Sequence, residues 1–201
     1  MRVGVLHPGE MGVTVLESLV ENDVSATWVK GGRSESTVQR ASSIPSVDTL
    51  EELVDSVETI ISVCPPSAAL EVALNIFNRG FKGIYVDANA ISPLESRKIA
   101  ELFGAAFVDG GIIGPPAKEA GTTRIYLSGM RSREVVDLFK VGKLEAIALS
   151  ESPDPEEITA ASALKMAYAG FSKGSSALLL AVNAFARKSG VLQALHKEWE
   201  I

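Results

Sequence analysis

VGVLHPGEMG, residues 3–12, is a β-branched apolar run that leads through a glycine-containing turn into a helical pattern. It matches the dinucleotide-binding fingerprint G-x-G-x-x-G at the second and third glycines, Gly9 and Gly12, with His7 at the first. Because Gly9 has no Cβ, the backbone there can approach a pyrophosphate closely, and Gly12 lets the first helix pack tightly on the sheet. We expect phosphates at the helix N-terminus, in contact with His7, Pro8, Gly9, Glu10 and Met11.

His7 precedes a proline, which favours an extended backbone. The sequence therefore predicts that His7 ends the strand without the positive φ that a glycine tolerates. Its imidazole is expected to face cofactor phosphate or neighbouring backbone, and a catalytic base is the alternative. For the loop as a whole, the alternative is a strand-to-helix turn with chance glycines. Its position at the start of a strand and helix pattern favours phosphate binding.

Short β-branched runs alternate with helical segments through most of the chain. This alternation is typical of right-handed βαβ units, so we predict an α/β fold with a Rossmann-type, doubly wound, mostly parallel sheet. Strands are predicted at residues 3–6, 26–29, 59–63 and 84–86, followed by helices at residues 11–22, 35–41, 68–78 and 94–103. Further strands at residues 106–108, 125–127 and 146–149 should extend the same sheet, in parallel or mixed orientation.

The sequence changes character at the turn Ser152-Pro153-Asp154-Pro155. Asp154 can cap a new helix, with Pro155 at its first position. We therefore assign residues 1–152 to a nucleotide-binding Rossmann domain and residues 153–201 to a short, all-α C-terminal region.

Residues 156–189 lack proline and predict one long helix, or two helices broken near Gly170 or Gly174. Gly190 is the expected stop, and a short final helix should follow it. An isolated helix of this length cannot leave its apolar side in water, so another subunit or a missing segment should cover it. We predict a homodimer that pairs through this helical region.

The composition is that of a soluble globular protein and excludes several classes of function. Hydrophobic residues make up 46% of the 201 residues, and the net charge of -6 offers no field that attracts nucleic acid. The N-terminus has no targeting pattern, and the longest apolar runs are far shorter than the roughly 20 residues needed to cross a bilayer. The single cysteine, Cys64, suggests a reduced, buried thiol and hence a cytoplasmic protein. No metal site is expected.

The segment Val29-Lys30-Gly31-Gly32-Arg33-Ser34, after the second predicted strand, bears on the choice of cofactor. NAD-specific sites place a carboxylate there, which would repel a 2′-phosphate. Here the segment has no acid. Arg33 can pair bidentately with a phosphate, Ser34 adds a hydroxyl and Lys30 adds a point charge, so NADP is the predicted cofactor. The alternatives are an exposed basic loop without a ligand and an FAD-linked protein.

Further motifs follow in order along the chain, at residues 63–66 (VCPP), 86–89 (VDAN), 108–114 (VDGGIIG) and 164–166 (LKM). Together with the first loop they resemble the β-hydroxyacid dehydrogenase superfamily, which includes 3-hydroxyisobutyrate dehydrogenase, 6-phosphogluconate dehydrogenase and the imine reductases. The pattern Lys-Met-x-Tyr-x-Gly-x-x-Lys-Gly at residues 165–174 is similar to that of a 6-phosphogluconate-dehydrogenase-like branch. The resemblance covers nearly the whole chain.

The resemblance implies roles for particular residues. In the superfamily a lysine on the long helix gives and takes the proton beside the nicotinamide, and Lys165 matches it. Asn89 is expected beside the nicotinamide, as a catalytic and cofactor-binding residue, and Cys64, Pro65 and Pro66 are expected to contact the cofactor. The alternatives are a solvated helix lysine at position 165 and an asparagine at position 89 that only caps the following turn.

The sequence departs from the superfamily pattern near the expected substrate. Ala169 replaces an asparagine, Asn183 replaces an acid, and the segment from Ile113 lacks the serine of a Ser-Gly-Gly loop. We predict an NADP-dependent oxidoreductase that transfers a hydride between nicotinamide and a small hydroxy acid, carbonyl or imine. The alternative is a non-catalytic NADP-binding module or redox sensor.

Overall fold

The chain folds as two units. The computed structural model describes residues 1–200; the first unit covers residues 1–165, and the second begins at residue 166. Residues 153–165, which were predicted to belong to the C-terminal region, therefore fold with the first unit. The predicted helix start at Asp154 and Pro155 was wrong: a 3₁₀ helix begins at Glu157 without a side-chain cap, and α7 begins at Ala160. The Asp154 carboxylate instead accepts a hydrogen bond of 2.8 Å from the Glu156 amide in the turn before them.

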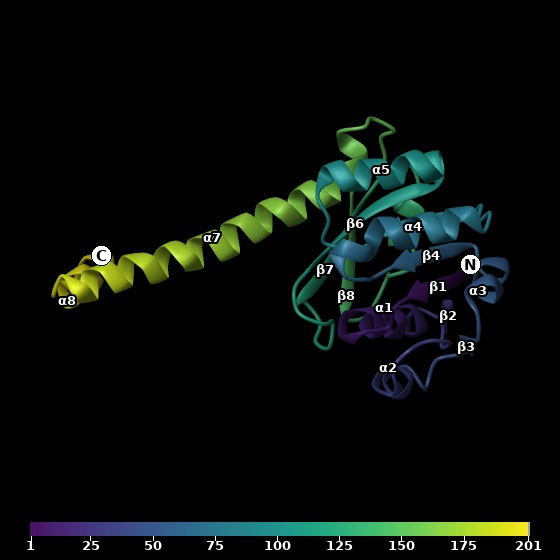
Figure 1. The fold of residues 1–201 in the computed structure, drawn as a ribbon, viewed down its shortest axis with the longest axis horizontal. Helices are drawn as coiled ribbons and strands as arrows, with labels where there is room; N and C mark the ends of the chain where they lie inside the picture. Colours follow the sequence, from purple (N-terminus) through teal and green to yellow (C-terminus); the bar gives the residue numbers. More distant parts are fainter. Residues whose placement is uncertain (201) are drawn as a thin grey trace. The chain divides into compact units, whose positions relative to one another are not determined.

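Within residues 1–200, eight strands form one sheet (Figure 1). Their bounds are β1 Arg2–Leu6, β2 Ser25–Val29, β3 Ser46–Val47, β4 Thr59–Ser62, β5 Ile84–Asp87, β6 Phe107–Ile113, β7 Thr123–Ser128 and β8 Leu144–Ser150. The order across the sheet is β3-β2-β1-β4-β5-β6-β7-β8. Neighbouring strands from β3 to β6 are parallel, β7 is antiparallel to β6, and β8 is parallel to β7. The predicted doubly wound, mostly parallel sheet is confirmed.

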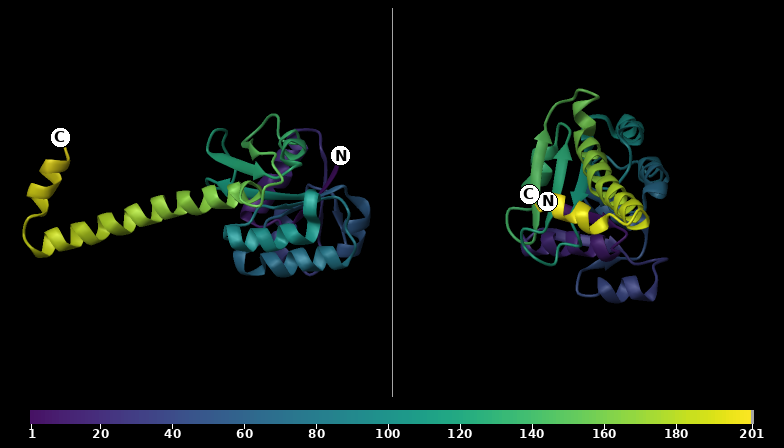
Figure 2. Two further views of the ribbon diagram at one scale, coloured as in Figure 1. Left: turned by 90° about the horizontal axis from the view of Figure 1, so that it is seen from above. Right: turned by 90° about the vertical axis from the view of Figure 1, so that its left-hand side faces the viewer.

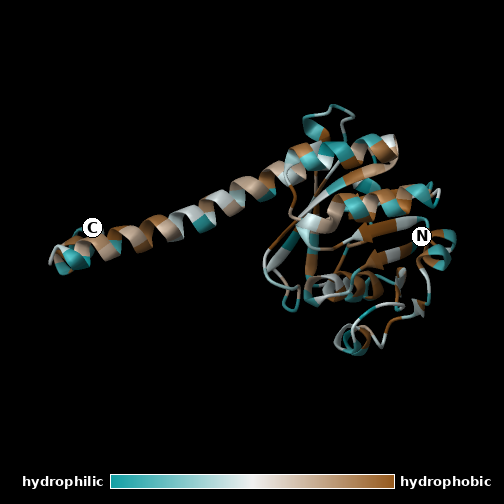
Figure 3. Ribbon diagram, in the orientation of Figure 1, coloured by the Kyte–Doolittle hydropathy of each residue, from teal (hydrophilic) through white to brown (hydrophobic). Residues whose placement is uncertain are grey.

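Helices cover both faces of this sheet (Figure 2). Their bounds are α1 Glu10–Glu21, α2 Glu35–Arg40, α3 Leu50–Ser56, α4 Ala69–Asn78, α5 Pro93–Phe103 and α6 Ser132–Val136. Successive side chains of a strand point to opposite faces. Val3 and Val5 of β1 therefore pack with α1 and α6, whereas Leu6 packs with α3, α4 and α5. Figure 3 shows the apolar strands near the N-terminus in brown between these helices.

Three elements were not predicted from the sequence: β3, α3 and α6. Helix α3 has a capping box, in which Thr49 Oγ1 accepts a hydrogen bond of 3.2 Å from the Glu52 amide and the Glu52 carboxylate accepts one of 3.4 Å from the Thr49 amide. This Thr-x-x-Glu signature can be read from a sequence. The other two elements have two and five residues, too few for a periodic pattern.

The long helix α7, Ala160–Lys188, is continuous, so the unbroken form of the two predicted alternatives is correct. Gly190 follows it with a φ of 73°, which confirms the predicted stop. In the second unit, α8, Leu192–Trp199, is tied to α7 by a hydrogen bond of 2.7 Å between His196 Nε2 and Asn183 Oδ1. Among the helices of residues 1–200, none is both long and apolar enough to span a membrane.

A buried carboxylate anchors the start of α7 to the sheet. Asp109 in β6 is fully buried and accepts hydrogen bonds from Ser96 Oγ at 2.7 Å and from both Oγ and the amide of Ser162 at 2.6 Å. Burial raises the pKa of Asp109, while these donors stabilise its charged form. Gly111 of β6 leaves room for the helix, because a Cβ there would lie 3.3 Å from Lys165 Cβ. These contacts bring Lys165 to the end of β6.

Candidate functional site

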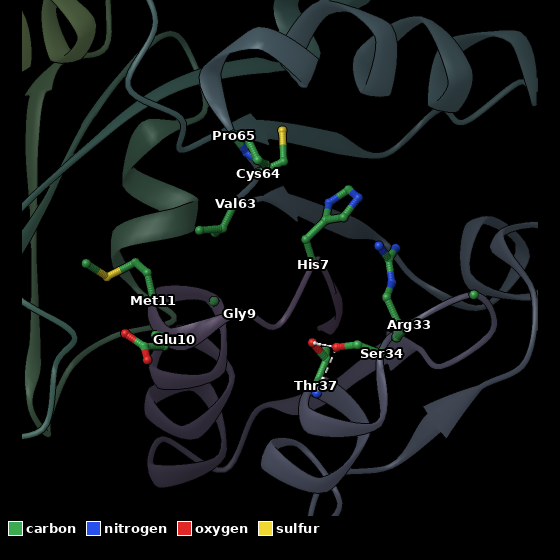
Figure 4. A pocket seen from close by; sticks show the side chains of 12 residues that line it. His7, Gly9, Glu10, Met11, Arg33, Ser34, Thr37, Val63, Cys64 and Pro65 are labelled. Carbon is green, nitrogen blue, oxygen red and sulfur yellow. Dashed lines mark hydrogen bonds between the residues drawn. The ribbon is translucent and has the colours of Figure 1, made fainter.

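A pocket of about 460 Å³ opens where β1, β2 and β4 end (Figure 4). Three loops line it, one after each strand. The lining residues are His7, Gly9, Glu10, Met11, Gly12, Gly32, Arg33, Ser34, Thr37, Val63, Cys64 and Pro65. The chain leaves β1 toward β2 on one side and β4 lies on the other, so the pocket is at the switch point where ligands bind in open α/β sheets.

The two glycines of the first loop serve different needs. A Cβ on Gly12 would lie 2.5 Å from the His7 carbonyl oxygen, so α1 can pack here only because this residue is a glycine. Gly9 has φ -67° and ψ -164°, an extended conformation open to any residue, and a Cβ there would meet only the His7 oxygen, at 3.9 Å. The fold therefore does not require glycine at position 9. A ligand that approached the backbone closely at this point would require it.

Backbone amides at the start of α1 face this space. The first N–H groups of a helix have no partner within the helix, and Gly9, at the N-cap, offers no side chain to cap them. Together with the positive end of the helix dipole, they form a site suited to phosphate oxygens. Gly9, Glu10 and Met11, which were expected at this turn, all line the pocket.

His7 has a φ of 62°, so the prediction of an extended backbone was wrong. The turn requires the conformation that glycine provides in the fingerprint, and the Gly9 amide donates a hydrogen bond of 2.7 Å to the His7 carbonyl within it. A non-glycine residue pays about 1–2 kcal/mol for this region of φ. Among the described residues, the buried His7 Nδ1 has no hydrogen-bond partner. Burial, and to a smaller extent the charge of Arg33, lowers the pKa of His7 to about 4.

The loop after β2 contributes a cation and two hydroxyls. Arg33 is half-buried, which lowers its pKa, and its Nε donates to the Val29 carbonyl at 3.4 Å. Beside it, Ser34 Oγ lies 3.0 Å from Thr37 Oγ1 and accepts a hydrogen bond of 3.3 Å from the Thr37 amide. Lys30 does not line the pocket; its Nζ forms an ion pair of 3.0 Å with Asp48.

Asn89 braces the loop after β4. It is 3% exposed, and its Oδ1 accepts a hydrogen bond of 2.5 Å from the Cys64 amide while its Nδ2 donates one of 3.2 Å to Ser62 Oγ. Cys64 is half-buried rather than buried as expected, and it lines the pocket with a thiol whose pKa is raised by burial. Asn89 thus connects the ends of β4 and β5.

Asp87, at the end of β5, holds Asn89 in place. Its Oδ1 accepts a hydrogen bond of 3.1 Å from the Asn89 amide, and its buried Oδ2 has no partner among the described residues. Burial, helped by the charge of Asp109, raises the pKa of Asp87 to about 7. A carboxyl group that titrates near neutral pH therefore lies behind the loop.

Lys165 lies near the end of β6. It is partly exposed, and its Nζ donates a hydrogen bond to the carbonyl oxygen of Ile112. Four predicted site residues besides Lys165 are not part of the pocket lining: Pro8, which is buried, and Lys30, Pro66 and Asn89. Within residues 1–200, no group of three His, Cys, Asp or Glu side chains is placed to hold a metal ion.

Four lining residues were not predicted to contact the ligand: Gly12, which was expected only to pack α1 on the sheet, and Gly32, Thr37 and Val63. Gly32 and Val63 directly adjoin predicted residues in the loops after β2 and β4. Thr37 follows Ser34 by three positions, and this spacing brings N-cap and N3 side chains together at a helix start. That signal was available in the sequence.

No protein-family model matches the chain. It is 31% identical over 199 residues to an uncharacterised 28.5 kDa protein in the 7S RNA 5′ region of Methanothermus fervidus, covering 97% of this chain and 74% of that relative. A solved conserved protein of unknown function, described as structurally similar to 3-hydroxyacid dehydrogenases, is 30% identical with a TM-score of 0.80, over 100% of this chain and 75% of that one.

The fold also matches an imine reductase from Myxococcus stipitatus, solved in complex with NADP+, at 18% identity and a TM-score of 0.71, over 99% of this chain and 70% of that one. This chain has a doubly wound sheet, a glycine-containing loop after β1 and a pocket at the switch point, which together are characteristic of Rossmann-fold proteins. The chain belongs to the β-hydroxyacid dehydrogenase superfamily.

The raised pKa of Asp87 leads to a prediction about stability. The folded state retains a proton that the unfolded state, with an aspartate pKa of about 3.9, releases. The contribution to stability is therefore complete below pH ~3.9 and is lost as the pH rises through about 7. In the parent protein, this group should lower the free energy of unfolding by about 2–3 kcal/mol as the pH rises from about 5 to about 8. Asp87→Asn should remove this decrease, as measured by urea denaturation at each pH.

Asp137→Asn, which changes an exposed aspartate, is the matched control and should leave the pH dependence as it is. If the Asp87 variant lost stability over this pH range as steeply as the parent protein does, the carboxyl group would not titrate as described.

Proposed function

We propose that this protein is an NADP-dependent oxidoreductase that transfers a hydride between nicotinamide and a small hydroxy acid, carbonyl or imine. The observation that carries the proposal is Gly9, a glycine that the backbone does not require and whose missing Cβ leaves room at the start of α1. Membership of a superfamily of dehydrogenases and reductases supports a nicotinamide cofactor there. The reducing cytoplasm suits a chain with a single cysteine.

Gly9→Ala tests the cofactor site. Because a Cβ at this position clashes with no protein atom, the melting temperature should stay within about 2 °C of the parent value. The same Cβ occupies the space that a pyrophosphate needs, so the Kd for NADPH, measured by fluorescence titration, should rise by about tenfold or more. Gly12→Ala is the contrasting variant and should lose stability, because its Cβ meets the His7 carbonyl. Unchanged NADPH affinity in Gly9→Ala would remove the proposed site.

Arg33, Ser34 and Thr37 favour NADP over NAD. The guanidinium of Arg33 and the two hydroxyls lie in one wall of the pocket, and the loop after β2 carries no carboxylate that would repel a 2′-phosphate. Lys30 takes a smaller part than the sequence suggests, because its charge is paired with Asp48. The Myxococcus stipitatus imine reductase has been solved both with NADP+ and, as a variant, with NAD+, so the choice rests on the residues of this chain.

Arg33→Ala should raise the Kd for NADPH by about 10–100-fold, because a charge-assisted pair with the 2′-phosphate is lost. The Kd for NADH should change by less than about threefold. Arg40→Ala removes an exposed arginine from the far end of α2 and is the control. Equal losses for both nucleotides in Arg33→Ala would place the arginine elsewhere on the ligand.

Lys165 is the proposed proton donor and acceptor. Hydride addition to a carbonyl or a neutral imine leaves an alkoxide or a nitrogen anion that needs a proton, and the reverse reaction needs a group to accept it. The Nζ of Lys165 is held at the end of β6 by the Ile112 carbonyl, on a helix start that Asp109 anchors. A positioned ammonium would also stabilise the developing negative charge. Asn89 is a weaker candidate for substrate contact, because its amide is already bonded to Cys64 and Ser62.

Lys165→Gln keeps a polar side chain with a hydrogen-bond donor but removes the ammonium group that can give up a proton. With a panel of small hydroxy acids, carbonyls and cyclic imines, followed by NADPH absorbance, we expect turnover to fall by about 10²–10⁴-fold. The Kd for NADPH should stay within about threefold of the parent value. Turnover equal to that of the parent protein would exclude this role for the lysine.

A second candidate is a non-catalytic NADP-binding module or redox sensor. Ala169 and Ile113 stand where superfamily members carry polar residues near the substrate, and neither has a polar side chain. This difference favours the second candidate. The substrate panel separates the two: tight NADPH binding without turnover on any compound would support the sensor.

We also propose a homodimer that pairs through the second unit. Phe171, Leu180 and Phe185 are 74%, 73% and 71% exposed, and Figure 3 shows apolar residues along several turns of α7. Exposed apolar side chains in this number mark an interaction surface. Light scattering should give twice the 21.2 kDa of one chain, and a monomer at micromolar concentration would contradict the proposal.

A further inference from the structure

His7 is the residue of the pocket that the fold explains least. It takes a φ of 62° where the fingerprint has glycine, although glycine would adopt this turn without strain. Its imidazole lies between Arg33 and Cys64 in Figure 4. The side chain therefore lines the pocket beside Arg33, and its buried Nδ1 has no partner among the described residues. A side chain on a strained backbone, with an unsatisfied buried nitrogen, points to a function in ligand binding.

Few charged groups surround this imidazole. From the loop after β2 comes the cation Arg33, and from the start of α1 comes Glu10, which Figure 4 places at the end of the pocket away from Arg33. The loop after β4 contributes the thiol of Cys64, which burial keeps protonated. A second cavity of about 140 Å³ behind His7 and Arg33 is lined by Leu6, Leu50, Val72 and Asn75, none of which titrates.

We propose that His7 takes up a proton when an anionic dinucleotide fills the pocket, so that the protein binds its cofactor more tightly as the pH falls. The inference rests on the proposed function, because it requires a ligand with a pyrophosphate in this pocket. In this proposal His7 couples proton binding to cofactor binding. This role is distinct from that of Lys165, which is proposed to transfer a proton to the substrate.

The reason lies in the charges before and after binding. In the unliganded pocket, burial and the Arg33 cation both disfavour the imidazolium, and the pKa of His7 is about 4. A pyrophosphate at the start of α1 brings two negative charges into the same pocket, and a 2′-phosphate would neutralise Arg33. Opposite charge within about 4–6 Å favours the charged form and outweighs added burial when the pair is close.

Linkage fixes the sign of the effect. Because the bound state would hold a proton that the free state lacks, affinity increases as the pH falls through the His7 pKa of the complex. Each pKa unit by which the ligand raises the pKa of His7 adds up to about tenfold in affinity below that pH. A glycine at this position would provide the turn without this dependence.

The experiment is isothermal titration calorimetry with NADPH at about pH 6, in two buffers of different ionisation enthalpy, which counts protons taken up on binding. His7→Asn is the test variant, because asparagine tolerates a positive φ and does not titrate. His7→Gly is a second variant that restores the fingerprint and keeps the test valid if the asparagine variant is unstable. His196→Asn is the control, since it removes the other of the two histidines.

We expect the parent protein and His196→Asn to take up about 0.5–1 proton more per NADPH than either His7 variant. The 2′-phosphate, which titrates near pH ~6, contributes equally in all four proteins and cancels in this comparison. Between about pH 7.5 and about pH 5.5, the parent affinity should increase about tenfold relative to the His7 variants. Equal proton counts in the parent and the His7 variants, with NADPH bound, would overturn the inference alone; no NADPH binding at any pH would overturn both proposals.

Discussion

The close approach of the His7 carbonyl to the first turn of α1 is the constraint on which the site depends. With a Cβ at position 12 only 2.5 Å from that oxygen, the helix could not begin so near the end of β1. Since β1 lies between β2 and β4, the loop after it faces the loops of both neighbours. The start of α1, the cation of Arg33 and the Cys64 segment therefore surround one space, and Gly12 is what allows α1 to begin there.

Two buried carboxylates organise the rest of the site. Asp87 binds the Asn89 amide, and Asn89 in turn binds the Cys64 amide that shapes the pocket wall. Asp109 binds the first turn of α7 and so positions Lys165. Burial disfavours the charged form of a carboxylate, which is why the pKa values of both groups are raised. Their cost is consistent with a role in fixing geometry around the pocket rather than in adding stability.

The sequence predicted the sheet, most of its helices and the position of the glycine-containing loop after β1, because these depend on local periodicity and on glycine spacing. It did not predict β3 or α6, which are too short to carry a period, and α3 was missed although its Thr49 and Glu52 form a recognisable capping box. In the site, Lys30 was assigned to the cofactor because pattern alone cannot show that Asp48 pairs with it. Such contacts between separate loops exist only once the chain has folded.

The first loop reverses the usual assignment of residues to backbone conformations. Position 7 requires a positive φ and carries a histidine, whereas position 9 has an ordinary extended backbone and carries a glycine. Selection for stability alone would favour glycine at position 7, where it relieves strain, and would accept almost any residue at position 9. Places where a local rule is broken without a gain in stability are typical of functional sites. Both exceptions line the same pocket, and the proposed phosphate-bearing ligand would account for both, since it would need bare backbone at position 9 and would gain a polar, titratable contact at position 7.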